Sequence, residues 1–151
     1  MLDINKQKMK YSQGGQKVFI YERDEDGNIL YEGYQSDDGF VYYHDLNGNK
    51  IPKGEEVEGF SEPKAFYANI SNKLSEVLVK EFGIDDSTSY CQLVTDKGYL
   101  PLKAGDVIWK RSEASYTDNG TADSESADYI VKGVADEGLT VDLYLLRKNI
   151  K

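Results

Sequence analysis

Short runs of strand-forming residues separated by glycine-centred turns recur along this chain, and that spacing restricts its fold more than any other feature. Valine, isoleucine and aromatic side chains, including 12 tyrosines, gather in the runs, whereas most of the 14 glycines fall between them. Such alternation is typical of a small antiparallel β-barrel or sandwich. The 151 residues are enough for one hydrophobic core. We therefore expect residues 1–151 to form a single, mainly β domain with one short helix and long hairpins or loops.

The front of the chain is expected to be rich in hairpins. The β-prone runs Gln16–Tyr21 and Ile29–Tyr34 flank Asp26-Gly27, a dipeptide that favours a tight turn because glycine accepts positive φ. A second hairpin is predicted around Asn47-Gly48. Residues 51–63 show no hydrophobic period and contain two prolines, so we interpret them as a connector.

The middle of the chain predicts the helix. Residues 65–70 alternate as a strand does, and Ser71 then suits the N-cap of a helix over 72–82, with Gly83 as its C-terminal stop. One face of this helix is apolar and is expected to pack on a sheet; its members are Leu74, Val77, Leu78 and Phe82. Further strands are predicted at 89–95, 107–109, 128–134 and 139–146.

Negative charge is concentrated in the front half, residues 16–62. Between Glu22 and Glu62 there are 12 acidic and 3 basic residues, which accounts for the whole formal net charge of −9. A segment of this kind is a poor candidate for wrapping nucleic acid, because that affinity comes from neutralising phosphates with Lys and Arg. It suits either a solvated face that keeps the protein dissolved or a surface that DNA passes without adhering.

Residues 112–127 are the one low-complexity tract, polar and nearly free of aliphatic side chains. Such a tract has little apolar surface with which to offset the entropy of ordering its backbone. We therefore expect a mobile loop there.

Localisation signals are missing from the sequence. No window approaches the roughly 18 apolar residues of a membrane span, and the first residues lack the apolar stretch of a signal peptide. We expect synthesis in the cytoplasm and no membrane contact. The single cysteine, Cys91, excludes an intrachain disulfide and a CxxC site, and is interpreted as a small buried residue.

Motifs that carry chemistry are incomplete, so we expect neither an enzyme nor a bound cofactor or metal. Glu22–Gly27 fits the first positions of a calcium-binding loop, but Gly33 stands where that loop requires a bidentate glutamate. His44 is the only histidine and is interpreted as an exposed strand end, since it has no second histidine for a metal and no serine elbow for a triad.

The tyrosines leave one alternative open. Exposed tyrosines can form a platform for sugars or a protein interface, which would make the chain a Tyr-rich carbohydrate-binding module. Tyrosines that alternate along strands also occur as half-buried packing, which is the other interpretation.

Five pieces follow one another in a particular order from the middle of the chain to its end. They are Phe66-Tyr67-Ala68-Asn69-Ile70, Phe82-Gly83, Ile108-Trp109, Tyr129 through Val134, and Tyr144 to Lys148. Their order and spacing resemble the head-closure, or stopper, proteins in the neck of long-tailed bacteriophages. The similarity covers just over half of the chain.

This resemblance implies a structural, non-enzymatic role. Such a protein forms a small β-barrel and assembles as a homo-oligomeric ring, a hexamer or a dodecamer, below the portal and adaptor rings. It closes the head after DNA packaging and gives the tail its docking platform. The expected place is the virion neck, after synthesis in the cytoplasm of the bacterial host, with passing contact to genomic DNA. Another head–tail joining component, such as a tail terminator, is the alternative.

Under the resemblance, two segments are candidate contact sites. The loop within 112–127 would contact a neighbouring ring or project into the channel as the closing element, and its candidate residues are Ser115, Tyr116, Thr117, Asp118, Asn119, Thr121 and Asp123. The chain end would dock a neighbour through Arg147, Lys148 and Lys151. The acidic front half would line or flank the channel.

Overall fold

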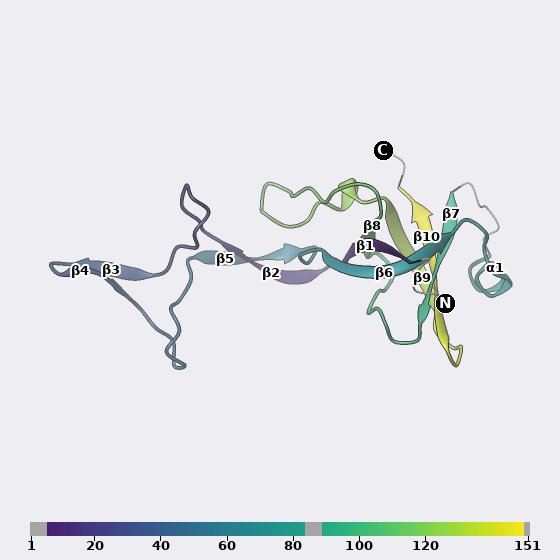
Figure 1. Cartoon of the computed structure of the whole chain (residues 1–151), viewed down its shortest axis with the longest axis horizontal. Coiled ribbons are helices and arrows are strands. Elements are labelled where there is room, and N and C mark those ends of the chain that lie inside the picture. The colour runs from purple at the N-terminus through teal and green to yellow at the C-terminus, as the bar shows by residue number, and fades with distance from the viewer. Residues whose placement is uncertain (1–5, 84–88, 150–151) are drawn as a thin grey trace.

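The computed structural model describes residues 6–83 and 89–149, and its centre is a closed antiparallel β-barrel (Figure 1). Going round the barrel, the strands are β1 (Gln7–Ser12), β6 (Lys64–Ser71), β7 (Tyr90–Asp96), β10 (Val141–Lys148), β9 (Tyr129–Ala135) and β8 (Val107–Trp109). The expected fold, a mainly β chain with a small antiparallel barrel and one short helix, is confirmed. The five barrel strands that were predicted lie within about two residues of those observed, as is usual for strand ends, whereas β1 was not predicted.

Strand β1 closes the barrel, because it pairs with β6 on one side and β8 on the other. Met9 lies opposite Phe66 in the first pair, and Lys10 lies opposite Trp109 in the second. Alternate residues of each strand point inward, as the period of two requires. The interior is filled by a cluster of buried residues: Met9, Phe66, Ala68, Cys91, Leu93, Leu100, Leu102, Ile108, Val131, Tyr144 and Leu146.

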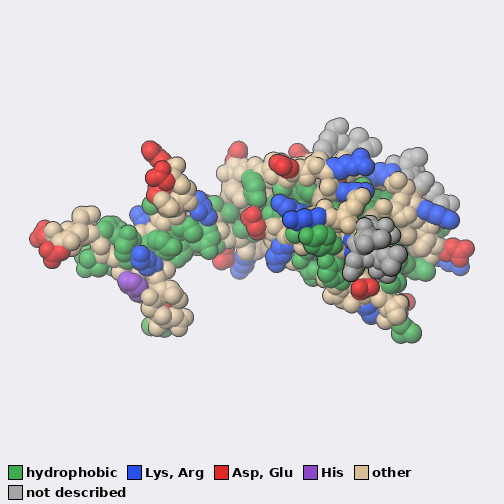
Figure 2. Space-filling view, viewed as in Figure 1, with side chains coloured by type: hydrophobic (Ala, Val, Ile, Leu, Met, Phe, Trp, Pro, Cys, Tyr) green, Lys and Arg blue, Asp and Glu red, His purple; other side chains and the backbone are tan. Residues whose placement is uncertain are grey.

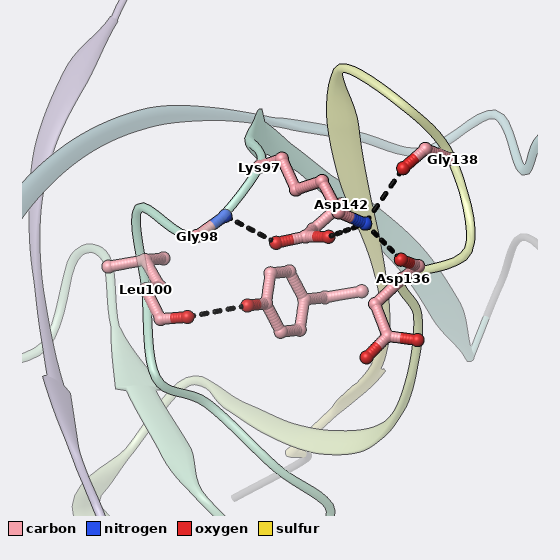
Figure 3. A network of polar contacts seen from close by, with 7 residues as sticks. Lys97, Gly98, Leu100, Asp136, Gly138 and Asp142 are labelled. Atoms are coloured by element: carbon pink, nitrogen blue, oxygen red, sulfur yellow. Dashed lines mark hydrogen bonds and ion pairs between the residues drawn. The ribbon is translucent and has the colours of Figure 1, made fainter.

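A polar network closes one end of the barrel, beyond the end of β7 (Figure 3). The buried carboxylate of Asp142 accepts a hydrogen bond from the Gly98 N–H at 2.9 Å and lies 3.9 Å from Lys97 Nζ. Lys97 Nζ also donates to the carbonyl groups of Asp136 and Gly138. Tyr144 Oη donates to the Leu100 carbonyl at 2.9 Å. Burial of Tyr144, together with the nearby carboxylates, raises the pKa of its hydroxyl to about 12.

Helix α1 (Glu76–Phe82) begins four residues later than predicted, so the proposed N-cap at Ser71 is wrong. Ser71 still belongs to β6, and Ser75 takes the N-cap position. The C-terminal prediction is confirmed: Gly83 has φ of 67° and its N–H donates to the Val79 carbonyl at 2.8 Å. The shorter helix keeps only part of the expected apolar face against the barrel.

Two neighbouring residues of α1 have opposite surroundings. Leu78 is fully buried against Leu145 and Ala135, with Leu74 and Phe82 packed beside it. Val77, expected on the same face, is 52 % exposed. Since successive helical residues point about 100° apart, a helix only seven residues long buries the direction of Leu78 and leaves that of Val77 in solvent.

An arm, residues 16–62, projects from the barrel between β1 and β6 (Figure 1). Its stem is the two-stranded pair β2 (Gln16–Tyr21) and β5 (Gly54–Gly59), and its far end is the hairpin of β3 (Gly33–Ser36) and β4 (Gly39–Tyr42).

Two predictions about the arm are therefore wrong. The strand at 16–21 pairs with 54–59 rather than with 29–34, and the expected connector at 51–63 contains β5. The physical reason is topological. Tyr11 of β1 lies opposite Lys64 of β6, so the intervening chain has to return to the point at which it left the barrel.

The two helix neighbours give a matched test of the core. Replacing Leu78 with Ala should lower the free energy of unfolding by about 2–5 kcal/mol, because it leaves a cavity in a packed site. Val77→Ala should change the free energy of unfolding by no more than about 0.5 kcal/mol. Urea unfolding followed by circular dichroism measures both; equal losses would contradict this placement of the helix.

Candidate functional site: an acidic arm and a basic barrel end

The arm has no hydrophobic core of its own. All of residues 16–62 are described, and none of their side chains is buried. Aromatic rings contact one another edge-on instead, with centroids 4.9 Å apart for Phe19–Tyr21 and for Phe40–Tyr42. Lys50 Nζ lies 4.1 Å from the ring centroid of Tyr42. An isolated two-stranded ribbon is only marginally stable in water. A partner that covered this half-exposed aromatic surface would add apolar burial that the arm lacks by itself.

Two side loops branch from the arm between stem and tip, and they repeat one local structure. In each, the carboxylate of an aspartate accepts two backbone N–H groups from the residues two and four positions later. These bonds are Asp26 and Asn28 to Asp24 Oδ1, both at 2.9 Å, and Asn47 and Asn49 to Asp45 Oδ1, at 2.9 and 3.0 Å. The pattern Asp-x-x-Gly-Asn at 24–28 and 45–49 is the signal in the sequence that would have shown the repeat.

These bonds explain why the first loop resembles a calcium site in its first positions. The carboxylate of Asp24 serves as the acceptor that closes the turn, and the N–H of Asn28 foremost lowers its pKa. Within residues 6–83 and 89–149, no group of three or more His, Cys, Asp or Glu side chains is placed to hold a metal ion. His44 is exposed in the second side loop, opposite Lys50.

The segment 112–127, expected as a mobile loop, packs against the root of the arm. Ala122 is buried and makes a β-bridge with Phe60, where the arm rejoins the barrel. Tyr116 Oη donates to Glu62 Oε1 at 3.2 Å. A Cβ added to Gly120 would lie 3.0 Å from the Ile20 side chain of the stem. We call residues 112–127 the brace; its mobility in solution stays a prediction.

The candidate residues of the brace do not share one environment. Exposed members are Ser115, Tyr116, Thr117, Asp118 and Asn119. Thr121 is buried against Gly59, so it has a structural part in the brace. Asp123 precedes the short helix η2 (Ser124–Ser126), and its carboxylate accepts from the Glu125 N–H at 3.0 Å.

A basic pocket of about 340 Å³ lies at the barrel end where β6 and β10 finish and β9 begins. Its lining residues are Ile70, Asn72, Lys110, Arg111, Asp128, Tyr129 and Lys148. Lys148 is thus one predicted docking residue that lines a pocket. Arg147 is exposed beside it, and Lys151 lies outside the described residues. Sequence analysis missed Lys110 and Arg111, which follow a buried strand and carry no motif.

Asp128 organises the backbone of this pocket. Its Oδ2 accepts the N–H groups of Lys110, Arg111 and Ser112 at 2.8, 2.8 and 2.9 Å, and its Oδ1 accepts from Ser112 Oγ at 2.7 Å. Burial raises the pKa of Asp128, but these hydrogen bonds outweigh burial and hold the pKa well below its usual range. The carboxylate is therefore charged at neutral pH and fixes the segment that carries the two basic side chains.

A second pocket, of about 500 Å³, lies where β6 and β7 diverge. The two strands pair only over Asn69–Ser71 and Gln92–Val94. Tyr67 and Tyr99 flank the opening, each about half exposed, and Tyr99 Oη accepts the Tyr67 N–H at 3.2 Å. Tyrosines beside a pocket are what the sugar-binding alternative would require.

Comparison of the chain with protein-family models, with curated proteins and with solved structures gives no match in any of the three. Among the described residues, no helix has both the length and the apolar character needed to span a bilayer.

Asp128 predicts a pH-dependent difference in stability. Because its folded pKa lies below the ordinary value of 3.8, the carboxylate contributes stability above about pH 4 that is lost as the pH falls further. Asp128→Asn should lower the free energy of unfolding at pH 7 by about 1–2 kcal/mol, since the amide keeps one neutral acceptor oxygen in place of two that share a negative charge. The deficit should shrink below pH 4 in thermal unfolding; a constant deficit from pH 7 to pH 2 would contradict this.

The brace predicts where the arm is fixed. Ala122→Glu would place a carboxylate among apolar side chains around Trp109. Hydrogen exchange should then speed up at 56–62 and 115–122 while β7 and β10 stay protected. Asp118→Ala, at an exposed brace position, is the control and should leave exchange unchanged. Faster exchange throughout the barrel would mean that the brace belongs to the core rather than to the arm's root.

Proposed function

We propose that this chain is a structural, non-enzymatic component of the neck of long-tailed bacteriophages. It closes the head after DNA packaging and provides the docking platform between the portal and adaptor rings and the tail. It acts as a homo-oligomeric ring in the virion neck and touches genomic DNA only in passing.

The observation that carries the proposal is where the five resembling pieces lie. Phe66–Ile70 belongs to β6, Phe82-Gly83 ends α1, and Ile108-Trp109 belongs to β8. The last two pieces, 129–134 and 144–148, lie in β9 and β10. The resemblance thus follows the wall of one small barrel and the helix packed on it.

The arm supports the same role through its shape and charge. It projects from the barrel and carries 12 carboxylates against four basic side chains (Figures 1 and 2). In a ring, its side loops would flank the channel, where negative charge repels the phosphates of DNA and lets the genome pass.

Two other functions compete with this one. A tail terminator would join head and tail from the other side of the junction. A carbohydrate-binding module would use Tyr67 and Tyr99 beside the 500 Å³ pocket. Binding of a glycan panel that Tyr67→Ala and Tyr99→Ala abolish would favour the module.

The deciding experiment deletes the gene in the phage that encodes it. We expect electron microscopy to show separate free tails beside tailless heads that have lost their DNA, with encapsidated DNA measured in the same lysate. Tailless heads that keep their genomes would favour a tail-side joining role. Normal virions would overturn the proposal.

A further inference from the structure

The tip of the arm lies at one end of the chain's long axis, whereas the basic pocket lies on the barrel (Figure 1). The arm leaves the barrel where β1 ends and β6 begins, and the pocket lies where β6 ends. β6 is eight residues long, so its ends are separated by roughly 23 Å at 3.3 Å per residue. The tip points away from the barrel (Figure 1). A contact between tip and pocket therefore has to involve two copies of the chain.

The pocket is suited to an anionic group. Lys110, Arg111 and Lys148 contribute three cationic side chains to the lining, against the single carboxylate of Asp128. That carboxylate already accepts the backbone N–H groups behind the lysine and arginine. Tyr129 adds an aromatic surface, so the pocket fits a partner that presents both carboxylates and apolar side chains.

The tip of the arm has that composition. Its turn, Ser36–Gly39, is closed by Ser36 Oγ donating to the Gly39 carbonyl at 2.8 Å, and it presents Asp37 and Asp38 in exposed positions. Behind the turn, Tyr34 and Phe40 are 50 % and 43 % exposed. Figure 2 shows acidic side chains at this extremity and basic ones spread over the barrel.

We propose that the acidic tip of one copy docks in the basic pocket of the next, so that the chain assembles head to tail. Such a contact is heterologous, and a heterologous contact that repeats builds a ring when its rotation closes. It would also cover the aromatic surface that the arm cannot bury alone. This inference rests on the proposed function, because it names the contact from which the proposed ring is built. Its own test, however, is self-association of the chain, which does not depend on the phage role.

The test exchanges charge between the two surfaces. We expect the full chain to self-associate in sedimentation velocity, more weakly as salt rises, since screening shortens the range of the attraction. Asp37→Lys with Asp38→Lys should weaken association at least about tenfold, and so should Lys110→Glu with Arg111→Glu. All four substitutions in one chain should restore association, because the complementary pair is rebuilt with opposite sign.

A matched control separates docking from net charge. Glu25→Lys with Asp26→Lys makes the same change of charge on the first side loop and should leave association within about twofold of the unsubstituted chain. Circular dichroism and thermal unfolding establish that every variant is folded.

Three results would overturn the inference. They are a chain that stays monomeric at about 1 mM, tip variants that associate like the unsubstituted chain, and a fourfold variant that is not restored. Loss of duplex DNA binding in the Lys110→Glu, Arg111→Glu variant, with association intact, would instead assign the pocket to nucleic acid. Normal virions after gene deletion would refute only the phage role and leave the association result standing.

Discussion

The pairing of β1 with β6 is the constraint on which the rest of the structure depends. Both strands form the barrel wall side by side, yet the whole arm lies between them in the sequence. The entropic cost of closing a loop rises only slowly with its length, so a long insertion between two neighbouring antiparallel strands is tolerated. It must leave and return at one place, however, so its two ends run antiparallel. That requirement accounts for the stem of β2 and β5. The sequence of β5 carries no strong strand signal of its own.

The projecting arm has no buried core of its own, and the brace and the aromatic ring contacts stabilise it at particular points instead. With no buried side chain between residues 16 and 62, the arm is held by backbone pairing, edge-on ring contacts and the two aspartate-closed side loops. The brace adds Ala122 and Tyr116 at the root, where a small displacement would be magnified along the arm. Within the described residues no such contact supports the tip, which is consistent with the docking proposed for it.

The accuracy of sequence-based prediction follows the range of the interactions involved. Five of the six barrel strands could be located because each alternates or carries β-branched and aromatic residues, whereas β1 was not predicted. Turns such as Asn47-Gly48 occur where glycine adopts a positive φ. The partner of Gln16–Tyr21 could not be predicted from the sequence. Ile29–Tyr34 is equally rich in strand-forming residues and follows the turn-favouring dipeptide Asp26-Gly27, so it competed with the true partner. The basic pocket could not be predicted from the sequence either. Lys110 and Lys148 come together only because β8 and β10 both pair with β9.

By itself, the sequence determined the class of fold, the positions of five of the six barrel strands, the burial of Cys91 and the concentration of acid in residues 16–62. These properties depend on neighbours a few residues apart, through alternation, turn chemistry and composition. The tertiary structure decided that the acidic segment is an arm, that residues 112–127 brace it, and that Asp128 fixes a basic pocket where β6 and β10 end. Each of these depends on contacts between residues distant in the chain, which alternation, turn chemistry and composition do not specify.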